Sequence, residues 1–283
     1  GTFLLYGRDL PRDLGRAEAL FEQAAEAGNG QGIEELGGFL MWSRRDWTKA
    51  EALLSRAGEM GRGSAWATLA EGAMYGYLGA GNRDRFDEFA ERARAAGSDR
   101  IPVLESERLQ WGISQRASGP KALATLEEAA ESGNATALKA LVSLTRDGND
   151  YNVRKRPDDA RAHLARHGDL LTAEERAYYS FSIEAALSRQ RRDLAGLAQR
   201  FAGGDWEMTK AMAEDLYAAN PNLVIFMLQR DLAERGIYGG PLNGLATRTT
   251  IRALFQGCRD LAYDRDCRED VLSPGVIADL FLG

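Results

Sequence analysis

The chain has 283 residues, of which 44% are hydrophobic, and its formal net charge is −6 at pH 7. This apolar share is that of a soluble globular protein with an ample core, and the acidic balance argues against general nucleic-acid binding. No apolar run approaches the roughly 20 residues that a membrane-spanning helix needs.

Residues 10–40 contain two amphipathic helical patterns, separated by the breaker Gly28-Asn29-Gly30. The first pattern places Ala17, Ala24 and Ala25 on one face, and the second lies around Leu36. Alanine lets two helix backbones approach closely, and Gly28 can adopt the left-handed conformation that ends a helix. The stretch therefore predicts a helix-turn-helix hairpin.

The same small residues recur further along the chain, at shifts of 33 or 36 residues. A period in the thirties, with two helices per unit, is typical of a solenoid in which no unit buries its face alone. We therefore predict an all-α fold: an α-solenoid of antiparallel helix hairpins, capped by a small helical C-terminal domain. The predicted packing positions are Ala17, Ala24, Ala25 and Gly28, then Ala50, Ala57 and Gly61, a weaker copy at Phe86, Ala93 and Gly97, and finally Ala122, Ala129, Ala130 and Gly133.

This spacing resembles the Sel-one-like repeat, a relative of the tetratricopeptide repeat found in bacterial envelope and signalling scaffolds. The resemblance covers roughly residues 1–170 and is carried by Leu10-Pro-Arg-Asp, Arg16-Ala17, the Ala24-Ala25-x-x-Gly28 run and Leu36-Gly37. It implies a superhelix whose concave face binds a protein partner. Residues 171–222 are predicted to be a degenerate helical repeat or connector, in which Thr172-Ala-Glu-Glu forms a capping box that opens a helix through Leu187.

The first seven residues, Gly1-Thr-Phe-Leu-Leu-Tyr-Gly, resemble the tail of a repeat's second helix. We therefore expect the sequence to begin inside a repeat and to be a fragment of a longer protein. Any membrane attachment is expected through a signal peptide, lipid anchor or membrane helix outside this chain.

Six aromatic residues and two histidines are candidates for binding. The aromatics suit capture of a peptide or a sugar chain if they line the concave face, and otherwise they fill gaps that alanine leaves between repeats; they are Trp42, Trp47, Trp66, Tyr75, Tyr77 and Trp111. His163 and His167 have the i, i+4 spacing of metal ligands, but Leu164 stands where an HExxH motif needs its glutamate, and no third ligand can be named. We predict no metal and no cofactor.

Residues 223–256 resemble a small peptidoglycan-binding module, through Leu228-Gln229, Leu232, Gly236, Tyr238, Gly240-Pro241, Gly244 and Thr247-Arg248. The resemblance implies glycan-binding positions at Gln229, Tyr238, Asn243, Thr247 and Arg248. However, Asn243 replaces the family's usual aspartate, and the segment from Gly244 to Thr247 is about three residues short of the family pattern. A structural cap on the open end of the solenoid is therefore the alternative role for this module.

The predicted C-terminal module spans residues 223–283 and contains the two cysteines of the chain, Cys258 and Cys267. Their separation is compatible with a disulfide that closes a short loop, worth roughly 2–3 kcal/mol. A disulfide indicates an oxidising compartment such as the periplasm. After Ser273-Pro274, the residues through Phe281 predict a final short helix that docks on the module.

Enzymatic motifs are missing from the sequence: it has no GxSxG elbow and no GxGxxG after a strand. We therefore predict a non-catalytic periplasmic scaffold or adaptor that mediates protein–protein interactions in the bacterial cell envelope, in exopolysaccharide production or export, envelope signalling or polar organisation. The alternative is a carbohydrate-binding protein. It would bind peptidoglycan through the C-terminal module or exopolysaccharide through the aromatic repeat loops.

Overall fold

The computed structural model describes residues 4–5, 13–79, 85–188, 193–260, 267 and 270–282, and the regular secondary structure of these residues is entirely helical. They form two compact units. The first holds residues 13–141, 150–153 and the pair Leu4–Leu5; the second holds residues 142–149 and the chain from Arg154 onward. Predictions for residues 1–3 and 6–12 lie outside the described part. None of the described helices combines the length and apolar character needed to cross a membrane.

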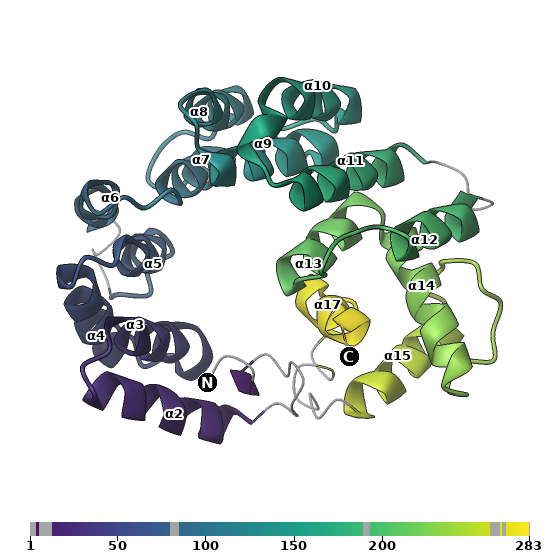
Figure 1. Ribbon diagram of the computed structural model, residues 1–283, viewed down its shortest axis with the longest axis horizontal. Helices are drawn as coiled ribbons and strands as arrows, with labels where there is room; N and C mark the ends of the chain where they lie inside the picture. The colour runs from purple at the N-terminus through teal and green to yellow at the C-terminus, as the bar shows by residue number, and fades with distance from the viewer. Residues whose placement is uncertain are drawn as a thin grey trace. The chain divides into compact units, whose positions relative to one another are not determined.

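The first unit is a series of helical hairpins, and successive helices between residues 14 and 131 contact one another (Figure 1, purple to teal). This arrangement confirms the predicted all-α fold of helix hairpins. A π-helical turn, η1 (Leu40–Arg44), extends α3. The hairpins are α2 (Leu14–Glu26) with α3 (Gly30–Phe39), α4 (Trp47–Glu59) with α5 (Gly63–Met74), α6 (Arg85–Ala95) with α7 (Ile101–Trp111), and α8 (Gly119–Glu131) with the start of α9 (Ala135–Asp147).

Each of the four hairpins turns at a glycine in the left-handed region: Gly28, Gly61, Gly97 and Gly133 have φ values of 75°, 87°, 77° and 92°. At every turn the glycine N–H donates to the carbonyl three residues before it, and the following N–H donates to the carbonyl five residues before it. These bonds satisfy carbonyls that the helix end leaves unpaired. A Cβ at any of the four glycines would meet nothing within 4 Å, so backbone conformation alone favours glycine there.

The small residues of the repeat lie where consecutive helices meet. Ala17, Ala50 and Ala122 are completely buried. A Cβ on Gly32 would lie 2.4 Å from the Cβ of Ala24, so the backbones of α2 and α3 come too close for a larger side chain. In the weaker third copy, the buried residues of α6 include the larger Phe86 and Phe89 as well as Ala90 and Ala93.

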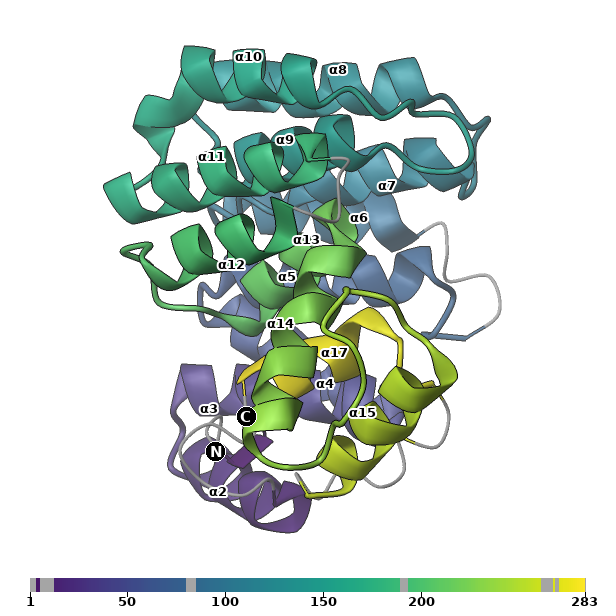
Figure 2. The ribbon, with the colours of Figure 1, turned by 90° about the vertical axis from the view of Figure 1, so that its right-hand side faces the viewer.

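The second unit contains the end of α9 and seven further α-helices of the described residues. They are α10 (Pro157–His167), followed by the 3-10 turn η3 (Gly168–Leu170), α11 (Ala173–Leu187), α12 (Leu194–Ala202), α13 (Lys210–Ala219), α14 (Pro221–Glu234), α15 (Arg248–Asp260) and α17 (Pro274–Leu282). Helices α10 and α11 pair with each other, and α17 lies against α13 and also contacts α14 and α15 (Figure 2). The predicted final helix therefore forms, but it packs chiefly against α13, which precedes the predicted module, and only to a lesser extent against α14 and α15 of that module.

Helix α11 begins with the predicted capping box. The Thr172 hydroxyl accepts from the Glu175 N–H at 3.1 Å, and the Glu175 carboxylate accepts from the Thr172 N–H at 3.0 Å. Its last residue is Leu187, as the sequence indicates. This helix end is specified by residues that are neighbours in the sequence.

The division between the units falls within α9, after Leu141, whereas the predicted boundaries lie after residues 170 and 222. The last two turns of α9 belong to the second unit because Ser143 and Arg146 bond to side chains of that unit, as described below.

Candidate functional site

Four aromatic side chains gather on the surface of the first unit, and we call them the aromatic cluster: Trp42, Trp47, Tyr75 and Tyr77. Each of these residues is between 38% and 42% exposed. Tyr77 is at the centre, with ring centroids 5.7 Å from Trp47 in a stacked arrangement and 6.0 Å from both Trp42 and Tyr75. The rings support one another while each keeps part of its surface in solvent. Such a group can supply apolar contact area to a ligand without first having to become ordered.

The cluster comes from the ends of helices in two successive hairpins. Trp42 lies in η1 and Trp47 is the first residue of α4. Tyr75 caps the C-terminus of α5, and Tyr77 follows in the loop. Gly76, between the two tyrosines, has a φ of 76°. This left-handed residue turns the chain at the end of α5 and so sets the positions of Tyr75 and Tyr77 relative to each other.

Carboxylates border the cluster on the side of α7. The Tyr75 hydroxyl donates to Glu107 at 3.3 Å, and Arg100 pairs with Glu71 at 2.6 Å. Burial and the nearby charge of Glu71 raise the pKa of Glu107, although Tyr75 and Arg100 act in the opposite direction. Burial and Glu107 in turn raise the pKa of the Tyr75 hydroxyl, which therefore stays protonated at neutral pH. The group has two carboxylates and one guanidinium.

The other two candidate aromatics are placed differently. Trp66 is buried and stacks on Phe89 at 6.1 Å, so it fills a gap between repeats. Trp111, at the end of α7, is 55% exposed and has no ring contact with the cluster. The sequence allows either a binding role or a packing role between repeats for all six residues. In the structure Trp66 is buried between repeats, and the other five residues are exposed.

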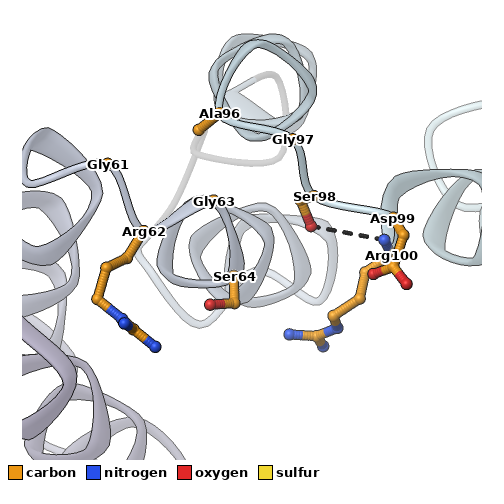
Figure 3. Close-up of a pocket in the computed structure, with 9 residues that line it drawn as sticks. All are labelled: Gly61, Arg62, Gly63, Ser64, Ala96, Gly97, Ser98, Asp99 and Arg100. Carbon is orange, nitrogen blue, oxygen red and sulfur yellow. Dashed lines mark hydrogen bonds between the residues drawn. The ribbon is translucent and has the colours of Figure 1, made fainter.

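The first unit also has a cavity of about 310 Å³ between two hairpin turns, lined by residues 61–64 and 96–100. Figure 3 shows Arg62 and Arg100 on either side of Ser64. Both guanidiniums are already paired, Arg62 with Glu34 and Arg100 with Glu71. The two arginines of the cavity therefore offer no unpaired positive charge to an anionic ligand.

The residues expected to bind glycan lie in and beside the loop between α14 and α15. Gln229 is in α14, Arg248 begins α15, and the other three lie between the two helices. Gln229 is completely buried, and its amide donates to Leu245 O at 3.1 Å and to Thr250 Oγ1 at 3.0 Å. Its oxygen accepts from the backbone N–H groups of Asn243 and Gly244, both at 2.9 Å. Gln229 thus holds the loop together from the inside.

Tyr238 is also buried, at 5% exposure, and its hydroxyl donates to the Pro241 carbonyl at 2.9 Å. The polar groups of Tyr238 and Gln229 are therefore used within the loop, which corrects the expectation that they face a glycan. Of the other three candidates, Thr247 and Arg248 are exposed and Asn243 is half-buried. Glycan binding through these three residues stays a prediction.

Cys258 of α15 and Cys267 are joined in a disulfide, and both are buried. His163 and His167 lie half-buried on α10. In the part of the chain that the structure describes, no three His, Cys, Asp or Glu side chains are grouped so that they could hold a metal ion.

A buried ionic network in the second unit was not predicted. Arg146 near the end of α9 is completely buried, and its guanidinium donates to Asp147, to Asp215 of α13 and to Ser182 of α11. Asp215 also accepts from the Tyr178 hydroxyl at 2.9 Å. The network ties three helices together, and no local motif marks it in the sequence.

No family model matches the chain, and no curated protein matches it. Among solved structures, it is similar to a Sel1 repeat protein from Oxalobacter formigenes, with a TM-score of 0.42 and 15% identity over 77% of this chain and 82% of that chain. It is also similar to a protective antigen of uropathogenic Escherichia coli strains that displays an SLR fold, with a TM-score of 0.37 and 18% identity over 99% of this chain and 66% of that chain. Both of these proteins are described as Sel1-like repeat structures, and this is the repeat that the spacing in the present sequence resembles.

Proposed function

We propose that the chain is a non-catalytic scaffold that binds a protein partner at the aromatic cluster of its first unit. The observation that carries this proposal is the exposure of four mutually supported aromatic rings, each close to 40%, on a rigid helical framework. Tryptophan and tyrosine are the residues most enriched among the energetically dominant contacts of protein interfaces.

The framework behind the cluster is well suited to hold such a surface. Helices α4 and α5 contribute completely buried residues to the core of the same unit, among them Leu54, Leu69 and Ala70. The ion pairs Arg62–Glu34 and Arg85–Glu51 link one hairpin to the next. Because Trp47 begins α4 and Tyr75 caps α5, and both rings contact Tyr77, a partner would lose little binding energy to ordering the surface.

The proposed location is the bacterial cell envelope, in an oxidising compartment such as the periplasm. The support is the Cys258–Cys267 disulfide, since disulfides persist in oxidising compartments. The resemblance of the repeat spacing to envelope scaffolds agrees with this proposal. Roles in exopolysaccharide production or export, envelope signalling or polar organisation all fit a scaffold of this kind.

The experiment places a photo-crosslinking amino acid at Tyr77 in the living source bacterium, with the same amino acid at Trp111 as the control. We expect a discrete protein to crosslink at Tyr77 and not at Trp111. That protein, purified, should bind the unmodified chain and lose roughly 30-fold in affinity to Tyr77→Ala, which corresponds to the 2 kcal/mol of a central interface aromatic. Equal crosslinking at both positions, or unchanged affinity, would refute the proposal.

The alternative is carbohydrate binding, either to exopolysaccharide at the aromatic cluster or to peptidoglycan at the loop before α15. The exposed Thr247 and Arg248 favour the second possibility. Co-sedimentation with purified peptidoglycan sacculi tests it. Pelleting that Arg248→Ala abolishes and Tyr77→Ala leaves intact would make the chain a wall-binding protein.

A further inference from the structure

The carboxylates beside the aromatic cluster carry more negative charge than the described cations around them compensate. Glu71 is paired with Arg100, and the group that bonds to Glu107 is the neutral Tyr75 hydroxyl. Glu107 is held close to Glu71 and is largely withdrawn from solvent, so its charge is poorly screened there. A cationic ligand would relieve this imbalance.

Aromatic faces attract cations as well, since their quadrupole is negative over the ring. Elsewhere in the first unit, arginines lie over rings: Arg44 over Phe39 at 5.2 Å, Arg85 over Phe89 at 4.5 Å, Arg92 over Trp66 at 4.9 Å and Arg108 over Phe86 at 4.2 Å. In the described ranges of this unit, no such cation lies over a ring of the aromatic cluster. The cluster therefore has ring surface available for a guanidinium supplied by a partner.

We propose that the segment bound at the aromatic cluster is a basic peptide, whose arginine lies against the tyrosine rings and pairs with Glu107. This inference rests on the proposed function and specifies the chemistry of the partner. Arginine suits the site better than lysine because its planar group stacks on a ring and donates to a carboxylate at the same time. A neutral sugar could stack on the rings but would leave the carboxylate charge uncompensated.

The charges on the other side of the cluster fix the direction of binding. Arg45, which lies between Trp42 and Trp47 in the sequence, is exposed and positively charged, and Asp46 next to it pairs with Lys49 at 3.4 Å. A cation is therefore repelled on the α4 side and attracted on the α7 side. The arginine of the partner is expected beside Tyr75, and the rest of its segment is expected across Tyr77 toward the tryptophans.

The experiment uses the whole chain and three short peptides that differ only at two positions: acetyl-Gly-Arg-Gly-Arg-Gly-amide, its lysine version and its glutamine version. Cellopentaose serves as the sugar probe. Binding at concentrations up to several millimolar is followed by tryptophan fluorescence and by calorimetry. We expect the arginine peptide to bind about fivefold to thirtyfold more tightly than the glutamine peptide, the range of a desolvated cation–π contact with a charge partner.

Three variants assign the binding to its site. Tyr77→Ala should abolish binding of the arginine peptide, and Glu107→Gln should reduce it severalfold and weaken its dependence on salt. Trp111→Ala, which removes an exposed aromatic outside the cluster, is the matched control and should change nothing. Far-UV circular dichroism and thermal melts confirm that each variant is folded before its affinity is interpreted.

Equal affinity for the arginine and glutamine peptides would overturn the inference, as would binding of cellopentaose that Tyr77→Ala abolishes, or no binding of any probe. These results are distinguishable from failure of the proposed function. If a protein crosslinks at Tyr77 through a neutral or acidic segment, the scaffold proposal stands and the basic-peptide inference fails. If no protein crosslinks at Tyr77, the proposed function fails whatever the peptides do.

Discussion

Replacing Arg146 by methionine should destabilise the second unit strongly, because the change leaves two carboxylates without their cation. Methionine has a similar length and no charge, so the main loss is electrostatic. Arg146 is completely buried and donates to Asp147 at 2.8 Å and to Asp215 at 2.9 Å, and the two carboxylates are only 16% and 14% exposed. Removing one partner of a buried pair costs about 3–5 kcal/mol, a large share of the roughly 5–15 kcal/mol by which domains are stable.

A second substitution gives the sharper test, because its effect should change sign with the background. In the unaltered chain, the Asp215 carboxylate accepts hydrogen bonds from Arg146, Tyr178 and Ser143. Asp215→Asn removes its charge, weakens these bonds and should be destabilising. In the Arg146→Met background, the same change removes one of the stranded carboxylates and should restore part of the lost stability. The coupling between the two sites is expected to be about 1–3 kcal/mol.

Urea unfolding followed by far-UV circular dichroism gives the free energies, and hydrogen exchange of peptides from α11 and α13 shows whether the loss is in the second unit. Arg200→Met is the matched control, since Arg200 pairs with Glu184 at 2.6 Å with both side chains about half exposed. It should cost no more than about 1 kcal/mol. The reasoning is refuted if Arg146→Met costs no more than Arg200→Met, or if Asp215→Asn is equally destabilising in both backgrounds.

Further predictions concern pH, turns and the loop before α15. Burial and Glu71 raise the pKa of Glu107 in the folded chain above its ordinary 4.5, so between these two pKa values the folded chain binds more protons than the unfolded chain, and its stability falls as pH rises through that range. Glu107→Gln should remove this loss of stability, so the free energy of unfolding, measured in urea at several pH values, should vary less with pH. An unchanged pH dependence would contradict the prediction. Gly133→Ala forces a side chain into the left-handed region and should lower the free energy of unfolding by about 1 kcal/mol. Gly38→Ala, near the end of α3 where η1 continues the helix and with open space around it, should raise the free energy of unfolding by roughly 0.5–1 kcal/mol. If thermal melts shift in the same direction for both, the turn argument fails. Gln229→Leu leaves the buried N–H groups that it holds without an acceptor and should cost about 2–4 kcal/mol, with faster hydrogen exchange in the loop; exchange rates like those of the unaltered chain would show that the loop does not depend on this side chain.

The sequence by itself determined the hairpins, because their signals are local. A glycine such as Gly28 or Gly133 ends a helix by its own backbone freedom, and alanines at fixed offsets permit close packing wherever they occur. The capping box of Thr172 and Glu175 is equally local. These features can be found without knowing which distant segments meet.

Tertiary structure decided the ionic network and the role of the loop glutamine. Arg146 finds Ser182 and Asp215 36 and 69 residues away in the sequence, and neither partner stands in a recognisable motif with it. Gln229 resembles a residue of a binding module, yet the shortened loop folds over it and uses all of its hydrogen-bonding capacity. Burial of a polar group is a property of its surroundings, which a local pattern does not contain.

The aromatic residues show most clearly which features the sequence determines and which only the packing of the fold determines. Composition and spacing could place Trp66 and Tyr77 near repeat loops but could not separate them. In the fold, Trp66 is covered by Phe89 of the next hairpin, whereas Tyr77 stays at the surface with the two tryptophans around it. Whether an aromatic ring is core or binding surface depends on which neighbouring helix covers it, and only the packing of successive hairpins determines that.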